Sequence, residues 1–362
     1  MLSEILTELI KQLWMSGGIN SIYETTTDVA YCYAHFLYLL SCCFKQTQHF
    51  EIENHMNKVI AVVVTYNRLN MLQQCVQHIK GQSLSCDIMI VDNASTDQTA
   101  EWCHSILSDG IYYENTGANI GGAGGFNYGM RRAAELGYNY VWIMDDDAFP
   151  EADCLKQLIK AGDKLGKFGF LSSIVLWTDG SICRMNWQKK LQKTKSRSLS
   201  HITDEDIAAH KSSDDKTLRI QSATFVSLLF PIETIRQAGL PIKEFFIWCD
   251  DIEYTRRISL KYNLPCYAVF DSITIHHTAA NVGTDLADDD EARIARYNYA
   301  FRNENYMYRQ YGIKGFITYT AICSYNALKV IKNAKTHKLQ RLGIIVKNYF
   351  TGLSFNPPIE RL

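Results

Sequence analysis

The sequence lacks an excess of charge of either sign. Lys and Arg number 37 and Asp and Glu number 38, so the formal net charge is −1 over 362 residues. Without a global basic field of the kind that attracts nucleic acid, we expect no nucleic-acid partner, and any charged ligand must meet a local patch. The 11 cysteines form no CxxC pair and are too sparse for a small disulfide-stapled secreted domain. We therefore expect a reducing compartment, with most thiols acting as small buried hydrophobes.

Two membrane-directed features are also missing. The opening residues contain no basic stretch followed by an apolar run and a small-residue cleavage site, which argues against a secretory signal. The most apolar N-terminal stretch, residues 29–44, is interrupted by tyrosines, His35 and Ser41, and it is shorter than the roughly 20 residues that a membrane span needs. We therefore expect a cytoplasmic protein in which this stretch is a packed helix.

What the sequence does contain, from Lys58 onward, is a regular alternation of apolar strands and helical patterns. Such alternation is typical of an α/β domain whose parallel strands are joined by crossover helices, and ligands gather at the carboxyl ends of such strands. Polar clusters occupy those positions after the first, second and fourth strands. The predicted strands span residues 59–65, 87–91, 111–114, 139–144, 169–176 and 219–227, and the predicted helices span 69–80, 97–107 and 123–136.

The flanking regions differ from this central pattern. Residues 1–55 show no strand pattern and are expected to be a helical N-terminal appendage or an upstream extension, with the catalytic domain spanning 56–285. Residues 286–362 are expected to be a C-terminal helical region, beginning with a helix from about residue 292 to 311. The polar residues 178–218 suggest a surface excursion that carries little chemistry.

Three adjacent carboxylates, Asp145, Asp146 and Asp147, directly follow the apolar strand ending at Met144. Adjacent carboxylates repel one another, so a site that keeps them together usually binds a cation. Mg²⁺ or Mn²⁺ accepts one or two carboxylates and fills its other positions with diphosphate oxygens. A nucleotide-diphosphate ligand is therefore the natural partner, and the alternative is a solvated acidic loop that caps the next helix.

Several strings in a fixed order narrow the hypothesis. They are VVVTYNR at 62–68, IVDNASTD at 90–97, NIGGAGGF at 119–126, and then the aspartate triplet. Together they resemble family 2 glycosyltransferases of the GT-A fold over roughly residues 58–280. The doubled glycines and the string WCDDIEY at 248–254 are most similar to bacterial galactofuranosyltransferases and neighbouring rhamnosyltransferases. The resemblance implies a mixed, Rossmann-like sheet with flanking helices and a nucleotide-sugar donor.

The resemblance also implies roles for residues on the donor side. It places Thr65 and Arg68 beside the nucleotide, Asp92 at the uracil edge and Asp146 near the ribose or donor sugar. It makes Asp145 and Asp147 ligands of Mn²⁺ or Mg²⁺. Asp92 could instead be a plain helix-start residue.

The glycine-rich segment before the third predicted helix has two interpretations. A glycine cluster that opens a helix lets backbone N–H groups approach a diphosphate closely. Packing glycines in a turn are the alternative from the sequence alone. The resemblance favours donor contact for Gly124 and Gly125.

On the acceptor side, the resemblance makes Asp251 the general base that takes the proton of the acceptor hydroxyl, as an inverting transfer requires. Asp250 would orient the acceptor, and Trp248 would offer an apolar face to a sugar ring. Acids in a first helical turn are also favoured by the helix dipole, so capping is the alternative.

A histidine pair, His276 and His277, ends the strand-like run 272–275. In this family such a pair resembles the third protein ligand of the cation, and neutral imidazole suits Mn²⁺. Packed structural histidines are the alternative, and the sequence leaves open which of the two would bind.

The tail from residue 312 to 362 carries eight Lys or Arg against one acid, interleaved with aromatic and aliphatic residues. Such a segment can lie on an anionic membrane surface, where it would meet a polyprenyl-linked glycan acceptor. A helical subdomain with a solvated basic face is the alternative.

The combined expectation is an inverting transfer of galactofuranose from UDP-galactofuranose during bacterial surface polysaccharide synthesis. A rhamnosyltransferase using dTDP-rhamnose shares the same strings and is the rival. A silent sugar-nucleotide-binding subunit would require broken acidic motifs, and none is broken. A nucleotidyltransferase would need a glycine-rich, basic triphosphate loop near the first strand, and the sequence shows none there.

Overall fold

The computed structural model describes residues 58–191, 200–281 and 283–362, and the predicted N-terminal appendage, residues 1–55, lies outside this range. Lys58–Leu362 form one compact unit. Six of the eight free cysteines in the described residues are buried, as predicted. None of the helices in these ranges combines the length and the apolarity that crossing a membrane requires.

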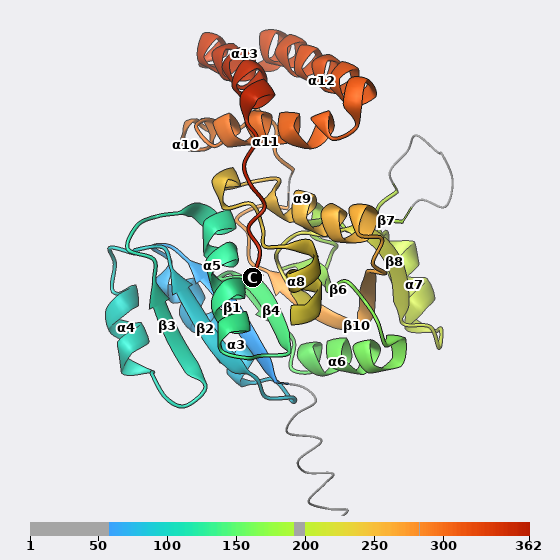
Figure 1. Ribbon diagram of the computed structural model, residues 1–362. Coiled ribbons are helices and arrows are strands. Elements are labelled where there is room, and N and C mark those ends of the chain that lie inside the picture. The colour runs from blue at the N-terminus through green and yellow to red at the C-terminus, as the bar shows by residue number, and fades with distance from the viewer. Residues whose placement is uncertain (1–57, 192–199, 282) are drawn as a thin grey trace, which may run out of the picture. The chain divides into compact units, whose positions relative to one another are not determined.

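The first half of the sheet is parallel, as predicted (Figure 1). Its strands lie in the order β3-β2-β1-β4, and each predicted boundary in this half is within two residues of the observed one. The strands are β1 (Val59–Thr65), β2 (Asp87–Asp92), β3 (Ile111–Asn115) and β4 (Tyr140–Asp145), and the intervening helices are α3 (Leu69–Lys80), α4 (Thr99–Ser105) and α5 (Gly121–Glu135).

Strand β1 is apolar along almost its whole length because both of its faces are covered. Successive side chains of a strand point to opposite faces. Ile60, Val62 and Val64 pack in one core together with Phe126 of α5. The residues between them pack in the other core together with Leu72 of α3.

The second half of the sheet is mixed, with the order continuing β9-β6-β10-β8-β7. Strand β9 is antiparallel to both β4 and β6, and β10 is parallel to β6 but antiparallel to β8 and β5. These strands are β5 (Ala148–Pro150), β6 (Leu171–Trp177), β7 (Lys189–Lys190), β8 (Thr217–Ser222), β9 (Leu228–Pro231) and β10 (Tyr267–His276).

The prediction of one strand at 219–227 is wrong. Strand β8 ends at Ser222 and pairs with β10 and β7 at the edge of the sheet, whereas β9 starts at Leu228 and inserts between β4 and β6. The residues between them carry the chain from one position in the sheet to the other. The helices of this half are α6 (Cys154–Leu165), η1 (Arg184–Asn186), α7 (Asp204–Lys211), α8 (Ile232–Ala238), η2 (Lys243–Phe245), α9 (Asp250–Arg256) and the π-helical turn η3 (Arg257–Lys261).

The region after residue 286 is helical and has a small core of its own, which includes Phe301, Tyr319 and Ile344. The helix predicted at 292–311 is divided into α10 and α11. Of the helices in this region, α11 lies nearest to α9 (Figure 1). The C-terminal end of the chain returns to the sheet domain, where Leu240 N donates to Glu360 O at 2.8 Å. The four helices are α10 (Glu291–Ile294), α11 (Tyr297–Arg309), α12 (Gly312–Asn333) and α13 (Lys338–Ser354).

Candidate active site

Three predicted polar clusters meet at the carboxyl ends of neighbouring strands. In the sheet register, Thr65 at the end of β1 lies beside Asp92 at the end of β2. On the other side of β1, Val64 lies beside Asp145 at the end of β4. The parallel arrangement therefore gathers these side chains at one edge, as the strand pattern predicts.

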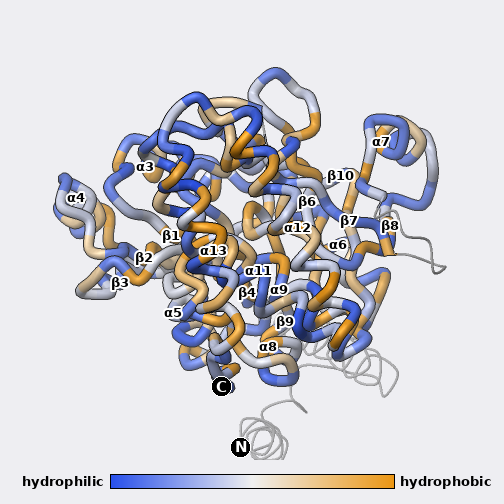
Figure 2. Tube along the Cα trace, turned by 90° about the horizontal axis from the view of Figure 1, so that it is seen from above, coloured by the Kyte–Doolittle hydropathy of each residue, from blue (hydrophilic) through white to orange (hydrophobic). Residues whose placement is uncertain are grey.

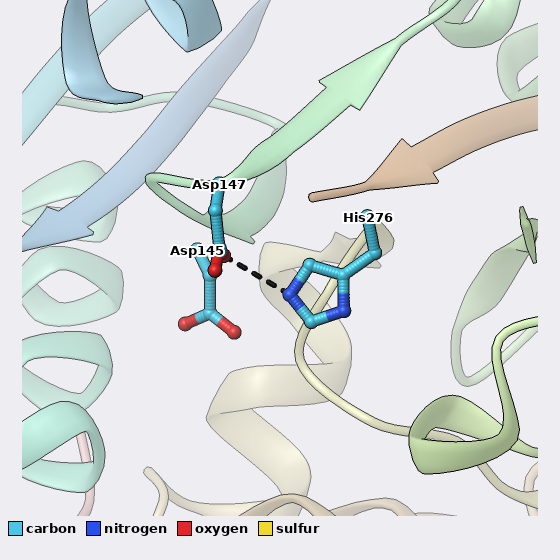
Figure 3. A group of neighbouring side chains, drawn as sticks. All are labelled: Asp145, Asp147 and His276. Atoms are coloured by element: carbon cyan, nitrogen blue, oxygen red, sulfur yellow. Dashed lines mark hydrogen bonds and ion pairs between the residues drawn. The ribbon is translucent and has the colours of Figure 1, made fainter. Parts of the chain in front are cut away.

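Asp145, Asp147 and His276 form a group in which one ligand atom from each residue lies within 4.8 Å of the others. Figure 3 shows the two carboxylates facing the imidazole. Strand pairing explains this placement, because β5 follows the triplet directly and pairs with the end of β10, with His276 opposite Ala148.

The second histidine of the pair points elsewhere. The ring of His277 packs on Phe149, with ring centres 4.2 Å apart, and only its backbone N–H reaches the triplet, donating to Asp147 O at 2.9 Å. Of the two histidines, His276 is therefore the one whose ring lies beside Asp145 and Asp147.

The three ionisable side chains of this group shift one another's pKa values. Burial and the neighbouring charge of Asp147 raise the pKa of Asp145 to about 8. Burial opposes ionisation of Asp147 too, but its hydrogen bond and ion pair with His276 and the charge of Arg68 hold its pKa at about 2. Burial would lower the pKa of His276, yet the contact with Asp147 raises it to about 10. Ionisation of Asp145 is therefore unfavourable in these surroundings, and a cation beside it would stabilise the ionised carboxylate.

Asn186 fixes the orientation of His276. The imidazole Nδ1–H donates to Asn186 Oδ1 at 2.7 Å, while Nε2 faces Asp147 Oδ1 at 3.0 Å. The Asn186 amide nitrogen donates to Thr224 Oγ1 at 2.8 Å, which sets the direction of the amide. With Nδ1 committed as a donor, Nε2 is the nitrogen that could bind a metal, once it gives up the proton that pairs it with Asp147.

Asn186 lies within residues 178–218, the segment expected to carry little chemistry, and it nevertheless contacts the candidate metal ligand His276. The interaction joins residues 90 positions apart. No local feature of the sequence signals it, because a lone asparagine in a polar stretch is usually a surface residue.

Asp146 faces away from the three-residue group and toward β1 and the turn after it. Thr65 Oγ1 donates to Asp146 Oδ2 at 2.7 Å. The Arg68 guanidinium bridges Asp146 at 2.9 Å and Asp147 at 2.7 Å. These contacts place Thr65, Arg68 and Asp146 together at the triplet, and their predicted nucleotide contacts remain predictions.

Asp92 is fully buried and already has two hydrogen-bond donors. Its carboxylate accepts from Ser95 N at 2.9 Å and from Tyr113 Oη at 2.8 Å. The bond from Ser95 shapes the turn after β2, but helix α4 begins only at Thr99, so Asp92 is not the helix-start residue of the alternative interpretation. Its contact with uracil stays a prediction.

Packing explains the glycines predicted to contact the donor. A Cβ at Gly125 would approach Val64 Cγ1 to 2.5 Å, and one at Gly124 would approach Ile120 to 2.9 Å. Gly121 has φ +73° and abuts the carbonyl of Phe246. Helix α5 thus needs glycine to approach β1 and the loop before α9, and donor contact by Gly124 and Gly125 stays a prediction.

The second acidic cluster lies within electrostatic reach of the first. Burial, then Asp251, and then Asp145 raise the pKa of the buried Asp250 well above its usual value. Burial raises the pKa of Asp251 to about 6, although the N–H of Ile252 and the charge of Lys189 oppose the rise. Lys189 lies on β7 and is a second residue of the 178–218 segment that the sequence did not single out.

The indole of Trp248 packs at the base of the C-terminal region. Its ring meets Tyr297 edge-to-face, with ring centres 5.0 Å apart. Trp248 as a whole is partly exposed, and its contact with a sugar ring stays a prediction.

The three-residue group fits a divalent cation. The half-buried carboxylate of Asp145, the buried carboxylate of Asp147 and one imidazole nitrogen are ligands that Mn²⁺ and Mg²⁺ sites use, and the remaining positions would be left for ligand oxygens. Metal-binding histidines typically donate the N–H of their other ring nitrogen to a protein oxygen, as His276 Nδ1–H does to Asn186 Oδ1.

Comparisons with known proteins place these features in a family context. The sequence model described as glycosyl transferase family 2 matches residues 60–208. The galactofuranosyltransferase GlfT1 of Mycolicibacterium smegmatis is 25% identical over 272 residues, which cover 72% of this chain and 86% of that protein. The GlfT1 of Mycobacterium tuberculosis H37Rv is 24% identical over 274 residues, 71% of this chain and 84% of that protein.

A solved structure supports the fold. The crystal structure of GalNAc-T7 with UDP, GalNAc and Mn²⁺ aligns over 69% of this chain and 50% of that chain, with a TM-score of 0.50 and 12% sequence identity. At this identity the likeness concerns the fold alone, and together with the mixed sheet it confirms the predicted GT-A architecture.

Proposed function

We propose that this glycosyltransferase, whose residues 60–208 match the model described as glycosyl transferase family 2, transfers galactofuranose from UDP-galactofuranose to a glycan acceptor. The proposed transfer proceeds with inversion and with the help of a divalent cation. The grouping of Asp145, Asp147 and His276 within 4.8 Å carries the proposal, because it offers a cation site for a diphosphate. The similarity to two galactofuranosyltransferases supports the choice of sugar.

The proposed reaction is a single displacement. The Asp251 carboxylate takes the proton of an acceptor hydroxyl as that oxygen forms a bond to the anomeric carbon. The bond from that carbon to the diphosphate breaks on the opposite face, and UDP leaves with the electron pair. One displacement inverts the anomeric configuration, Asp250 orients the acceptor and Trp248 offers its indole to a sugar ring.

The donor end would be held by residues at the strand ends. Asp145, Asp147 and His276 would bind Mn²⁺ or Mg²⁺, which when bound would neutralise charge on the departing diphosphate. We propose that Thr65, Arg68, Asp92 and Asp146 contact the nucleotide and its sugar, with backbone of the Gly124–Gly125 segment close to the diphosphate.

A donor screen tests the proposal. Nucleotide release is measured from a panel of UDP, dTDP and GDP sugars in the presence of Mn²⁺. UDP-galactofuranose should be consumed faster than UDP-galactopyranose or dTDP-rhamnose. A clear preference for dTDP-rhamnose would select the rhamnosyltransferase alternative, and no release from any donor would overturn the transferase mechanism.

We also propose that the enzyme works on the cytoplasmic face of an anionic membrane, where a polyprenyl-linked acceptor of cell-envelope synthesis would reside. Large apolar side chains of α12 and α13 are exposed, including Ile313 at 77% and Leu339 at 86%. Figure 2 shows apolar and polar residues alternating along these helices. The same two helices also carry the exposed lysines Lys314, Lys332 and Lys347. Apolar insertion combined with basic charge suits an anionic lipid surface.

Flotation with phosphatidylglycerol vesicles tests membrane binding. The protein should float at low salt and less so as salt screens the attraction. Leu339→Glu should weaken flotation, whereas Glu233→Gln on the sheet domain should not. Absence of flotation at low salt would favour a helical subdomain with a merely solvated basic face.

A further inference from the structure

The loop that leads into α9 has an unusual backbone. Phe246, Trp248 and Cys249 have φ values of 65°, 64° and 68°, although none of them is glycine. A side chain with a Cβ is disfavoured in this left-handed region, so such a run persists only where the surroundings hold it. Asp250 and Asp251 follow immediately, and the first helical bond of this turn joins Glu253 N to Cys249 O at 2.9 Å. The backbone at Cys249 therefore sets where α9 starts and where Asp251 points.

One buried side chain of α11 holds this loop. Asn303 is fully buried, and its amide nitrogen donates to three loop carbonyls, those of Phe245 at 3.0 Å, Ile247 at 3.3 Å and Trp248 at 2.9 Å. Its own Oδ1 accepts from the Arg302 guanidinium at 2.9 Å and 3.1 Å. The amide is therefore oriented with its N–H bonds toward the loop.

The chemistry of this contact explains why an asparagine stands there. Three carbonyl oxygens that converge on one point repel each other unless a donor lies between them, and a buried carbonyl left without a partner is costly. A neutral amide supplies two N–H donors, and one of them is shared between two carbonyls. A carboxylate of the same shape would have no proton to offer and would add repulsion.

The opposite side of the loop is also fixed. Ala123 N at the start of α5 donates to Phe246 O at 3.1 Å, and the Phe246 ring stacks on Tyr299 of α11 with centres 4.7 Å apart. The loop is thus held between the glycine-rich start of α5 and one face of α11. The C-terminal helical region contributes directly to the backbone that carries Trp248 and Asp251.

We infer that Asn303 is a positioning residue for sugar transfer, which holds the loop before α9 so that Asp251 and Trp248 meet the acceptor. This inference rests on the proposed function, in which Asp251 is the base. Asn303 touches neither the cation site nor the predicted nucleotide residues, so its loss should leave donor binding intact and damage the acceptor step.

The test compares two buried asparagines on the same helix. Asn305 is also buried, but its amide donates to Tyr349 O of α13 at 2.7 Å, away from the loop. Asn303→Ala and Asn305→Ala each remove a buried amide, and Asn303→Asp keeps the shape while removing the donor. The measurements are melting temperature, calorimetric UDP binding with Mn²⁺, hydrogen exchange of residues 245–253, and UDP release from UDP-galactofuranose with n-octyl glycosides as acceptors.

Asn303→Ala and Asn303→Asp should keep UDP affinity, exchange faster at residues 245–253, and lose about 10²-fold in transfer, the usual cost of a small misplacement of a catalytic group. Asn305→Ala should keep both exchange in that segment and transfer, even where its melting temperature falls equally. The inference fails if the Asn303 variants transfer at the wild-type rate, or if Asn305→Ala loses as much. Failure of the proposed function would look different, because wild-type protein would then release no UDP.

Discussion

The aspartate triplet and the loop before α9 both present carboxylates, but they are built in opposite ways. The triplet ends a regular strand, and its partners Thr65 and Arg68 come from the end of the neighbouring strand. The loop before α9 has three left-handed non-glycine residues and depends on Asn303, 55 positions away from Trp248. Strand ends therefore supply most of the side proposed to bind the donor, whereas side-chain contacts from far along the chain shape the side proposed to bind the acceptor.

The difference teaches which parts of the site can change separately. Residues at the strand ends are fixed by the sheet register, so a substitution there should alter charge without moving the backbone. The loop is held by side-chain hydrogen bonds, so its geometry can be lost while the sheet persists. Variants of the two clusters should therefore fail in different ways, and the predictions below exploit this.

Asp147→Asn should have the largest effect, because it removes the charge that pairs with His276 and Arg68 and would hold a cation. An amide carries no charge to bind Mn²⁺ against a diphosphate. UDP binding with Mn²⁺, measured by calorimetry, should be lost together with transfer. Asp163→Asn, on α6 and away from the site, is the control, and unchanged UDP binding by Asp147→Asn would remove that residue from the cation site.

Asp251→Asn should damage only the chemical step. The amide keeps the side-chain shape but cannot take a proton, so transfer should fall by about 10²- to 10⁴-fold, the usual contribution of a positioned base. UDP should still bind with Mn²⁺ at wild-type affinity. A fully active variant would exclude Asp251 as the base, and Glu253, two positions further along α9, would become the next candidate.

The same contrast explains what the sequence could predict. The strand at 59–65 and the helix at 69–80 are confirmed as predicted, because their apolar periodicity reflects burial on the faces of one sheet. His276 at a strand end, beside the triplet, follows from the resemblance to known enzymes. The sequence could not tell which of the two histidines lies beside the aspartates, because that depends on how β5 pairs with the end of β10.

Asn186 and Asn303 escaped prediction for a related reason. Each is an ordinary polar residue by composition, and each acts through partners far along the chain. The split of the predicted strand 219–227 into β8 and β9 has the same origin, since local β-propensity does not say which neighbours a strand will pair with.

Asn186→Ala should have an intermediate effect on the donor side. Loss of the acceptor for His276 Nδ1–H leaves the ring less firmly oriented, and removing a hydrogen-bond partner of a metal ligand usually costs about 10- to 100-fold in metal affinity. Mn²⁺ titration by calorimetry in the presence of UDP measures this. Asn186→Asp, which keeps an acceptor oxygen, should recover most of the affinity, and an unaffected Asn186→Ala would show that another contact orients the ring.

The smallest effect we predict is on pH dependence, and it concerns the acceptor side. Burial raises the pKa of Asp251 to about 6, while the positive charge of Lys189 opposes that rise. A base acts only when deprotonated, so kcat should be level above about pH 6 and should fall about tenfold per pH unit below it. Removing the opposing charge in Lys189→Met should raise the pKa of Asp251 and move the falling part of the kcat profile toward higher pH.

The measurement is kcat between pH 5 and 8 at saturating UDP-galactofuranose and Mn²⁺. UDP binding is followed in parallel, so that titration of the cation site can be told apart from titration of Asp251. A falling part that stays in place in Lys189→Met, with donor binding unchanged, would assign the ionisation to a group other than Asp251.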